Sequence, residues 1–84
     1  MNEAQTTGVA AVDRAFLILS AFQEGDVSLT LAILARRTGL YKSTILRLMQ
    51  SLIRAGFVLR LPDGNYAVGT AATRLSRLQH PAAA

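Results

Sequence analysis

A small residue, a glycine and a branched apolar residue stand at a fixed spacing in the middle of this chain: Ala35, Gly39 and Ile45. Where two helices cross steeply through a short turn, the first needs a small side chain at the crossing and the turn needs a residue that tolerates positive φ. The second helix needs a branched apolar side chain that points back toward the first helix. The spacing therefore predicts a helix-turn-helix unit. Its other apolar contacts are expected from Leu34, Leu40 and Leu48.

The helices of this unit are expected over residues 31–38 and 42–55. Thr30 has a side chain that can cap the first of them, and Gly56 follows the second where a helix commonly ends. The second helix is amphipathic, since its apolar residues recur at steps of three and four. They are Ile45, Leu48, Met49, Leu52 and Ile53.

Another helix is expected before this unit, over residues 10–23, with Gly25 ending it. Its expected core face consists of Val12, Ala15, Phe16, Leu19 and Phe22. A second apolar stripe has two interpretations, ordinary partial burial or a contact between two copies of the chain. This stripe consists of Ala11, Ile18 and Ala21.

A β-hairpin is expected after the unit, because residues 57–61 alternate in the strand manner, PDGN has turn chemistry and residues 66–68 form a returning strand. Thr70 can then cap a last helix over residues 70–80. Its narrow apolar stripe consists of Ala71, Leu75 and Leu78. The predicted fold is mainly α with a small β-hairpin: three helices, a two-stranded wing and a C-terminal linker helix.

The 84 residues correspond to about one small domain. Residues 1–8 are polar, small and without periodicity, and are expected to form a flexible arm. The domain itself is expected over residues 9–69, followed by the linker helix at 70–80 and a disordered tail at 81–84.

Positive charge is concentrated on the predicted helix-turn-helix and wing. No acidic residue occurs between Asp26 and Asp63, whereas six of the nine basic residues lie there. They are Arg36, Arg37, Lys42, Arg47, Arg54 and Arg60. Arginine suits forked contact with phosphate or guanine edges, so the pattern favours double-stranded DNA as the partner.

In a helix-turn-helix unit the second helix enters the major groove with its N-terminal part. The residues expected at DNA there are Tyr41, Lys42, Ser43, Thr44, Leu46 and Arg47. Arg47 can reach a guanine edge or a phosphate. Leu46 either touches a thymine methyl group or is tolerated at the surface.

Four further residues are candidate contacts to the DNA backbone. Arg36 and Arg37 close the helix at 31–38, where they either contact DNA or only complement the helix dipole. Arg60 and Asn65 lie on or beside the hairpin, where they either contact the flanking backbone or the minor groove as a wing does or belong to a solvated strand end.

Three segments, AAVDRAFLILSAF, SLTLAILARRTGLYKSTILRLMQSLIRAGFV and NYAVG, resemble in order and spacing the N-terminal DNA-binding domain of the IclR family of bacterial transcriptional regulators. The resemblance implies a winged helix-turn-helix that binds a palindromic operator as a dimer. It also implies that the first helix and the helix after the wing form the dimer contact, which places Ala11, Ile18, Leu75 and Leu78 there. Tyr41 departs from the family, which often has Pro or a small residue at this position.

The family continues into a C-terminal domain that binds a small-molecule effector, and these 84 residues have no room for it. A different use of the same fold, as a winged helix that binds another protein, is the alternative. The basic face argues against it, although acidic proteins also bind basic faces.

Other functions have little support in the sequence. The single histidine, His80, and the absence of cysteine leave no ligand set for a metal, and no catalytic motif is present, so neither an enzyme nor a cofactor is expected. The apolar run at 15–22 is far shorter than the roughly 20 residues of a membrane span. A chain without cysteine fits a reducing cytoplasm.

Overall fold

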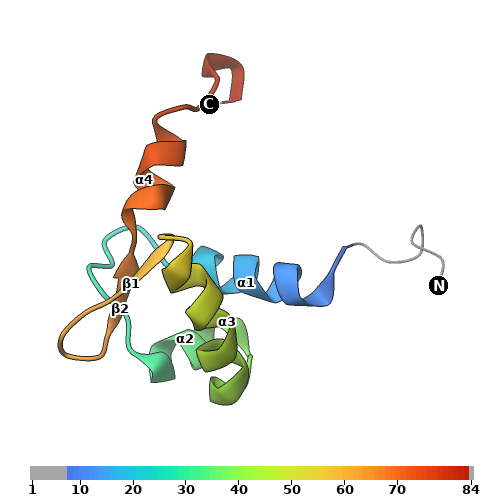
Figure 1. The fold of residues 1–84 in the computed structure, drawn as a ribbon, viewed down its shortest axis with the longest axis vertical. Helices are drawn as coiled ribbons and strands as arrows, with labels where there is room; N and C mark the ends of the chain where they lie inside the picture. The colour runs from blue at the N-terminus through green and yellow to red at the C-terminus, as the bar shows by residue number, and fades with distance from the viewer. Residues whose placement is uncertain (1–7, 84) are drawn as a thin grey trace.

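The structure is a computed structural model that describes residues 8–83. The domain has four α-helices and a two-stranded antiparallel hairpin that lies at one edge of the helical body, which confirms the predicted winged helix-turn-helix (Figure 1). The elements in chain order are α1 (Ala10–Ser20), α2 (Leu31–Thr38), α3 (Lys42–Arg54), β1 (Val58–Arg60), β2 (Tyr66–Val68), α4 (Thr70–Ser76) and the 3-10 turn η2 (Pro81–Ala83). Apart from Gly8, the expected N-terminal arm lies outside the described residues.

The core lies where α1, α2 and α3 meet the hairpin. Its fully buried large side chains are Ile18, Leu34, Ile45, Met49 and Val58. Burying apolar surface of this kind is the main favourable contribution to folding, and each such side chain contributes about 1.5–3 kcal/mol.

Helix α1 packs through a face that overlaps only in part with the predicted one. Ala15, Leu19 and Phe22 of the predicted face are partly buried against the core, as expected. Ile18 and Ala21 are buried, whereas Phe16 and Val12 are 60% and 48% exposed. The sequence could not decide between the faces, because α1 is apolar on most of its circumference. The helix is also shorter than predicted and ends at Ser20, and Gly25 lies in the following loop with φ of 93°.

The turn between α2 and α3 has the predicted geometry. Gly39 adopts the left-handed conformation with φ of 75°, and its N–H donates to the Ala35 carbonyl at 2.9 Å. At the other end of α2, the Thr30 hydroxyl accepts from the Ile33 N–H at 3.1 Å, which confirms the predicted cap. Both ends of α2 are therefore fixed by local hydrogen bonds.

Strands β1 and β2 pair with Val58 opposite Val68 and Arg60 opposite Tyr66. Leu29, in the segment before α2, forms a further bridge to Tyr66 through two backbone hydrogen bonds of 2.8 Å. This bridge, which the sequence did not predict, attaches the start of the helix-turn-helix to the wing.

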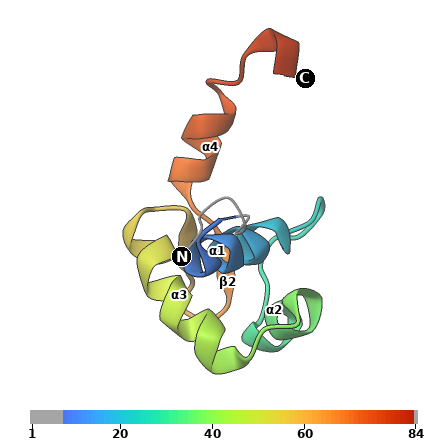
Figure 2. The ribbon, with the colours of Figure 1, turned by 90° about the vertical axis from the view of Figure 1, so that its right-hand side faces the viewer.

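Helix α4 projects from the body of the domain on the side opposite to α2 and the first turn of α3 (Figures 1 and 2). Gly69, not Thr70, occupies its N-cap position, so the predicted cap is wrong. The helix ends at Ser76 rather than at residue 80. The 3-10 turn at Pro81–Ala83 lies where no regular structure was predicted.

Candidate nucleic-acid interface

Helix α3 is anchored by one face and presents the opposite face to solvent. Ile45, Met49 and Leu52 point into the core, and the position of the helix is thereby fixed. Of the residues expected at DNA, Tyr41 and Leu46 are 82% and 42% exposed. Lys42, Ser43 and Arg47 are also exposed, and Thr44 is half-buried.

The start of α3 favours an anion. Tyr41 is the N-cap residue, and its side chain makes no capping hydrogen bond. The first N–H groups of a helix lack partners within it, and the helix dipole adds partial positive charge at the same end. The first turn of α3 carries no acidic residue, and Lys42 begins the helix. This end of α3 therefore combines backbone donors, hydroxyl groups and a cation.

Gln50 lies one turn beyond Arg47 on the exposed face of α3 and was not among the expected contacts. Residues three apart on a helix are neighbours on its surface. The spacing of Gln50 from Arg47 could therefore have identified Gln50 as a further candidate contact from the sequence. Arg54, a further turn along, is also exposed, and its guanidinium lies 3.4 Å from the Ser51 hydroxyl.

Arg36 and Arg37 differ in their surroundings although they are adjacent. Arg37 Nη1 donates to the Ala21 carbonyl at 2.9 Å and to Asp26 Oδ2 at 2.7 Å. The same carboxylate oxygen accepts from the Gln23 N–H at 2.7 Å. Arg37 thus links the loop after α1 to the end of α2 while remaining partly exposed at the surface. Arg36 is exposed.

The pKa of the Asp26 carboxyl lies below its ordinary value of 3.8. The hydrogen bond from Arg37 is the largest cause, and the hydrogen bond from the Gln23 N–H adds to it. Both donors stabilise the ionised carboxylate. Asp26, the last acid before the basic stretch, is therefore neutralised locally by Arg37.

On the wing, the Arg60 side chain is exposed and its guanidinium carbon lies 5.8 Å from the centroid of the Tyr66 ring. Asn65 has a different environment, because the Asp63 carboxylate accepts from its backbone N–H at 2.9 Å and from its side-chain amide at 3.4 Å. Arg60 therefore presents a cation beside an aromatic ring, whereas Asn65 stabilises the hairpin turn.

One of the four residues expected at a dimer contact cannot lie there. Ile18 is fully buried inside the domain because it belongs to the face of α1 that packs on the core. Ala11 is exposed, and Leu75 and Leu78 are 48% and 70% exposed. An apolar groove of about 540 Å³ lies between α1, α3 and α4. Its lining includes Val12, Phe16, Leu19, Leu52, Phe57 and Leu75.

The described residues offer little for other kinds of site. They contain no group of three or more histidine and acidic residues that could hold a metal ion. None of their helices has the length and apolar character needed to cross a bilayer.

A scan against protein families gives one match that decides the family. Residues 11–62, more than half of the chain, match the IclR helix-turn-helix domain. The chain belongs to the IclR family. The matched segment contains α1 except for its first residue, the helix-turn-helix unit and the first wing strand, so it includes the predicted reading helix. A comparison with curated proteins found no match.

Solved structures of IclR-type regulators share the fold. A regulator from a Silicibacter species is 34% identical with a TM-score of 0.74, and the match covers 83% of this chain and 27% of that one. An IclR family regulator from Brucella abortus is 28% identical with a TM-score of 0.79, covering 92% and 30%. A homologue from Microbacterium hydrocarbonoxydans, solved with 4-hydroxybenzoate, is 25% identical with a TM-score of 0.68, covering 86% and 29%.

The chain spans less than a third of the length of these relatives. What it shares with them is the helix-turn-helix domain. IclR family members of this kind are transcriptional regulators and not enzymes.

Proposed function

We propose that this IclR-type domain binds operator DNA sequence-specifically, with α3 in the major groove. The observation that carries the proposal is the exposed start of α3. An uncapped helix N-terminus there stands beside Lys42, Ser43 and Arg47, within a stretch that has no acidic residue from Val27 to Pro62. An acid on this surface would face phosphate and oppose binding.

The residues of α3 divide between positioning and reading. Lys42, Ser43 and Thr44 lie in the first turn, where backbone N–H groups and hydroxyls contact phosphate and fix the register of the protein on the duplex. Arg47 lies further along the helix and reads a base edge, with guanine as its preferred partner. Tyr41 and Leu46 supply exposed apolar surface for thymine methyl groups.

The wing and the end of α2 add backbone contacts. Arg60 reaches the DNA flanking the major-groove site, and Arg36 contacts phosphate. Arg37 and Asn65 contribute less, since Arg37 is hydrogen-bonded to Asp26 and Asn65 to Asp63.

The domain acts as a homodimer on a palindromic operator, with one α3 in each of two major grooves. The proposed contact between copies consists of Ala11, Val12 and Phe16 of α1 with Leu75 and Leu78. Apart from Ala11, these are large apolar side chains that the isolated domain leaves exposed, and Val12, Phe16 and Leu75 line one groove. Exposed patches of this type mark interaction surfaces.

The domain is part of a bacterial regulator that works in the cytoplasm, where the DNA is. Any small-molecule effector acts through a C-terminal domain that these 84 residues do not include. The relatives are more than three times as long as the segment they share with this chain, and one was solved with 4-hydroxybenzoate.

A gel-shift titration against random-sequence duplex at several salt concentrations tests DNA binding itself. We expect a shift at low salt and a fall in affinity with salt whose log-log slope is about 0.9 per neutralised phosphate. Absence of a shift at low salt would exclude DNA and favour the alternative, a winged helix that binds an acidic protein.

A further inference from the structure

Helix α4 begins at a point of unusually close backbone approach. A Cβ atom placed on Gly69 would lie 2.2 Å from the Gly56 carbonyl oxygen, 2.8 Å from the Gly56 carbonyl carbon and 3.0 Å from the Phe57 carbonyl carbon. All three atoms are backbone atoms, so no side-chain rotation can make room. The φ of Gly69 is −88°, which any residue adopts, so the requirement for glycine comes from space alone.

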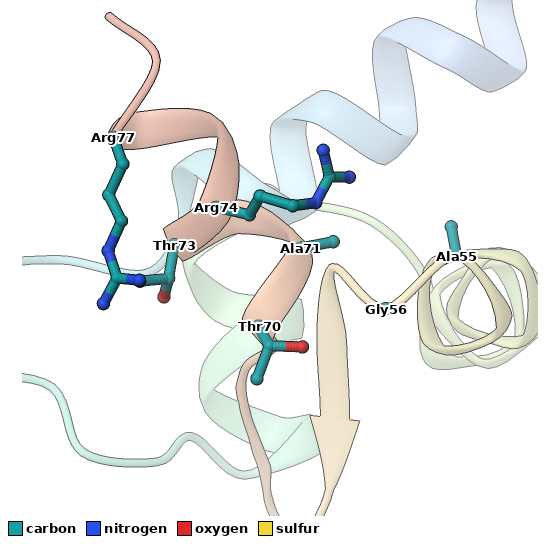
Figure 3. Close-up of a pocket in the computed structure, with 7 residues that line it drawn as sticks. All are labelled: Ala55, Gly56, Thr70, Ala71, Thr73, Arg74 and Arg77. Carbon is teal, nitrogen blue, oxygen red and sulfur yellow. The ribbon is translucent and has the colours of Figure 1, made fainter.

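Two hydrogen bonds hold this contact together. The Gly69 N–H donates to the Phe57 carbonyl at 2.9 Å, and the Ala71 N–H donates to the Gly56 carbonyl at 3.0 Å. The donors belong to the start of α4, and the acceptors belong to the two residues that follow the C-cap of α3. Figure 3 shows Gly56 at the end of α3 beside the first turn of α4.

The end of α3 is itself well defined. Gly56 adopts φ of 82°, its N–H donates to the Ile53 carbonyl at 2.9 Å, and the Phe57 N–H donates to the Leu52 carbonyl at 3.0 Å. These two bonds, with Gly56 in the left-handed conformation, form the Schellman motif with which helices commonly end. The start of α4 is therefore attached to a rigid part of the proposed reading helix.

Beyond this joint, α4 projects from the domain, and its residues from Thr73 onward are exposed (Figures 1 and 2). Arg74 and Arg77 extend to different sides of the helix and do not converge on a common ligand (Figure 3). The direction of α4 is thus determined by the joint at Gly69 and Gly56.

We propose that Gly69 is a specificity-determining residue that sets the half-site spacing read by the dimer. This inference rests on the proposed function, in which Leu75 of α4 contacts the second copy. The close approach at Gly69 fixes the direction of α4 relative to α3, and the contact through α4 fixes the separation of the two α3 helices. Spacing is then selected by geometry, because two linked sites gain affinity only when both can bind at once.

The first test measures the direction of α4 without DNA, in the Gly69→Ala chain and, as a matched control, the Thr70→Ala chain. The chain has no cysteine, so Gln50→Cys on α3 and Ser76→Cys on α4 give one defined pair of spin labels. Labelled chains are diluted with unlabelled chains so that only distances within one copy are measured. Gly69→Ala should shift or broaden the distance distribution, and Thr70→Ala should not. An unchanged distribution in Gly69→Ala overturns the inference.

The second test measures affinity for duplexes that carry two half-sites at different spacings and for a duplex with one half-site. We expect the unsubstituted chain and Thr70→Ala to favour one spacing over the single half-site by about 100-fold. Gly69→Ala should keep its single half-site affinity within about twofold, and its preference should move to another spacing or fall below about tenfold. The same spacing preference in Gly69→Ala and the unsubstituted chain overturns the inference.

A failure of the proposed function has a different signature. If the unsubstituted chain binds no duplex, the DNA-binding proposal is wrong and the spacing inference falls with it. If it binds all spacings equally, DNA binding stands and only the inference is overturned.

Should Gly69→Ala not fold, Ala71→Gly takes its place, because a glycine in the first turn of α4 loosens the same joint without adding an atom. It should weaken the spacing preference, and an unaltered preference overturns the inference.

Discussion

At the scale of single residues, Arg47 is the side chain to which the proposed function assigns base reading. It is exposed on α3, past the first turn, which is proposed to contact phosphate. We expect Arg47→Ala to weaken operator binding by about 1–3 kcal/mol and to weaken binding to random duplex less. Dissociation constants on both duplexes measure this, and Arg54→Ala, two turns further along α3, is the matched control. Equal losses on both duplexes would make Arg47 a phosphate contact only.

The pair formed by Asp26 and Arg37 gives the fold a defined pH dependence. The pKa of Asp26 is lowered in the folded chain, so this contribution to stability is fully present above the ordinary value of 3.8 and is lost as pH falls through the lower folded pKa. We expect the coupling between Asp26→Asn and Arg37→Gln, measured as free energies of unfolding in a double-mutant cycle, to be constant near neutral pH. It should decline below a pH of about 4. A coupling as large at the acid limit as at neutral pH would contradict this role.

Single residues also show where sequence reasoning reached its limit. Thr30 and Gly39 were predictable, because a cap and a positive-φ turn depend on local chemistry. The interior position of Ile18 was not, since α1 is apolar on two stripes and only the packing of the other helices chooses between them. The pairing of Arg37 with Asp26 likewise depends on how the loop after α1 folds back, for which the sequence carries no local signal.

At the scale of elements, the turn between α2 and α3 depends on Thr38, which sequence analysis did not single out. Its hydroxyl donates to the Leu34 carbonyl at 2.7 Å and accepts from the Leu40 N–H at 3.1 Å. One side chain thus ties the last turn of α2 to the chain that leads into α3.

We expect Thr38→Val to lower the free energy of unfolding by about 1–3 kcal/mol, because the half-buried Leu40 N–H loses its partner. Thr38→Ser keeps the hydroxyl and should lose much less. Urea denaturation of both variants measures the difference. If Thr38→Ser were as unstable as Thr38→Val, the methyl group and not the hydroxyl would be the important part.

The helices and strands themselves were largely predictable, and their errors lie at the ends. The residues of β2 agree with the prediction, because turn chemistry fixes a short hairpin. Helix α4 ends earlier than predicted, since it has no fully buried side chain and a short exposed helix gains little from packing. The bridge between Leu29 and Tyr66 joins distant segments, and a single isolated residue has no periodicity from which to predict it.

At the scale of the whole molecule, we expect the exposed residues of the groove between α1, α3 and α4 to affect dimerisation and the buried core residues to affect stability. Leu75 lines the groove and is 48% exposed, whereas Ile18 is fully buried in the core. We expect Leu75→Glu to shift the chain from dimer to monomer in sedimentation velocity with little change in thermal stability. Ile18→Ala should instead lower stability by about 2–5 kcal/mol through the cavity it leaves. A Leu75→Glu chain that remains dimeric would remove α4 from the dimer contact.

In the proposed complex, the reading helix, the wing and the projecting helix α4 of one copy form half of a symmetric DNA reader. Selection from a random-sequence DNA library tests it most directly, because the recovered site reports both the bases that are read and the symmetry of the complex. We predict an inverted repeat whose half-sites lie about 10–10.5 base pairs apart or a multiple of that distance. Recovery of a single asymmetric site, or no enrichment over random sequence, would contradict it.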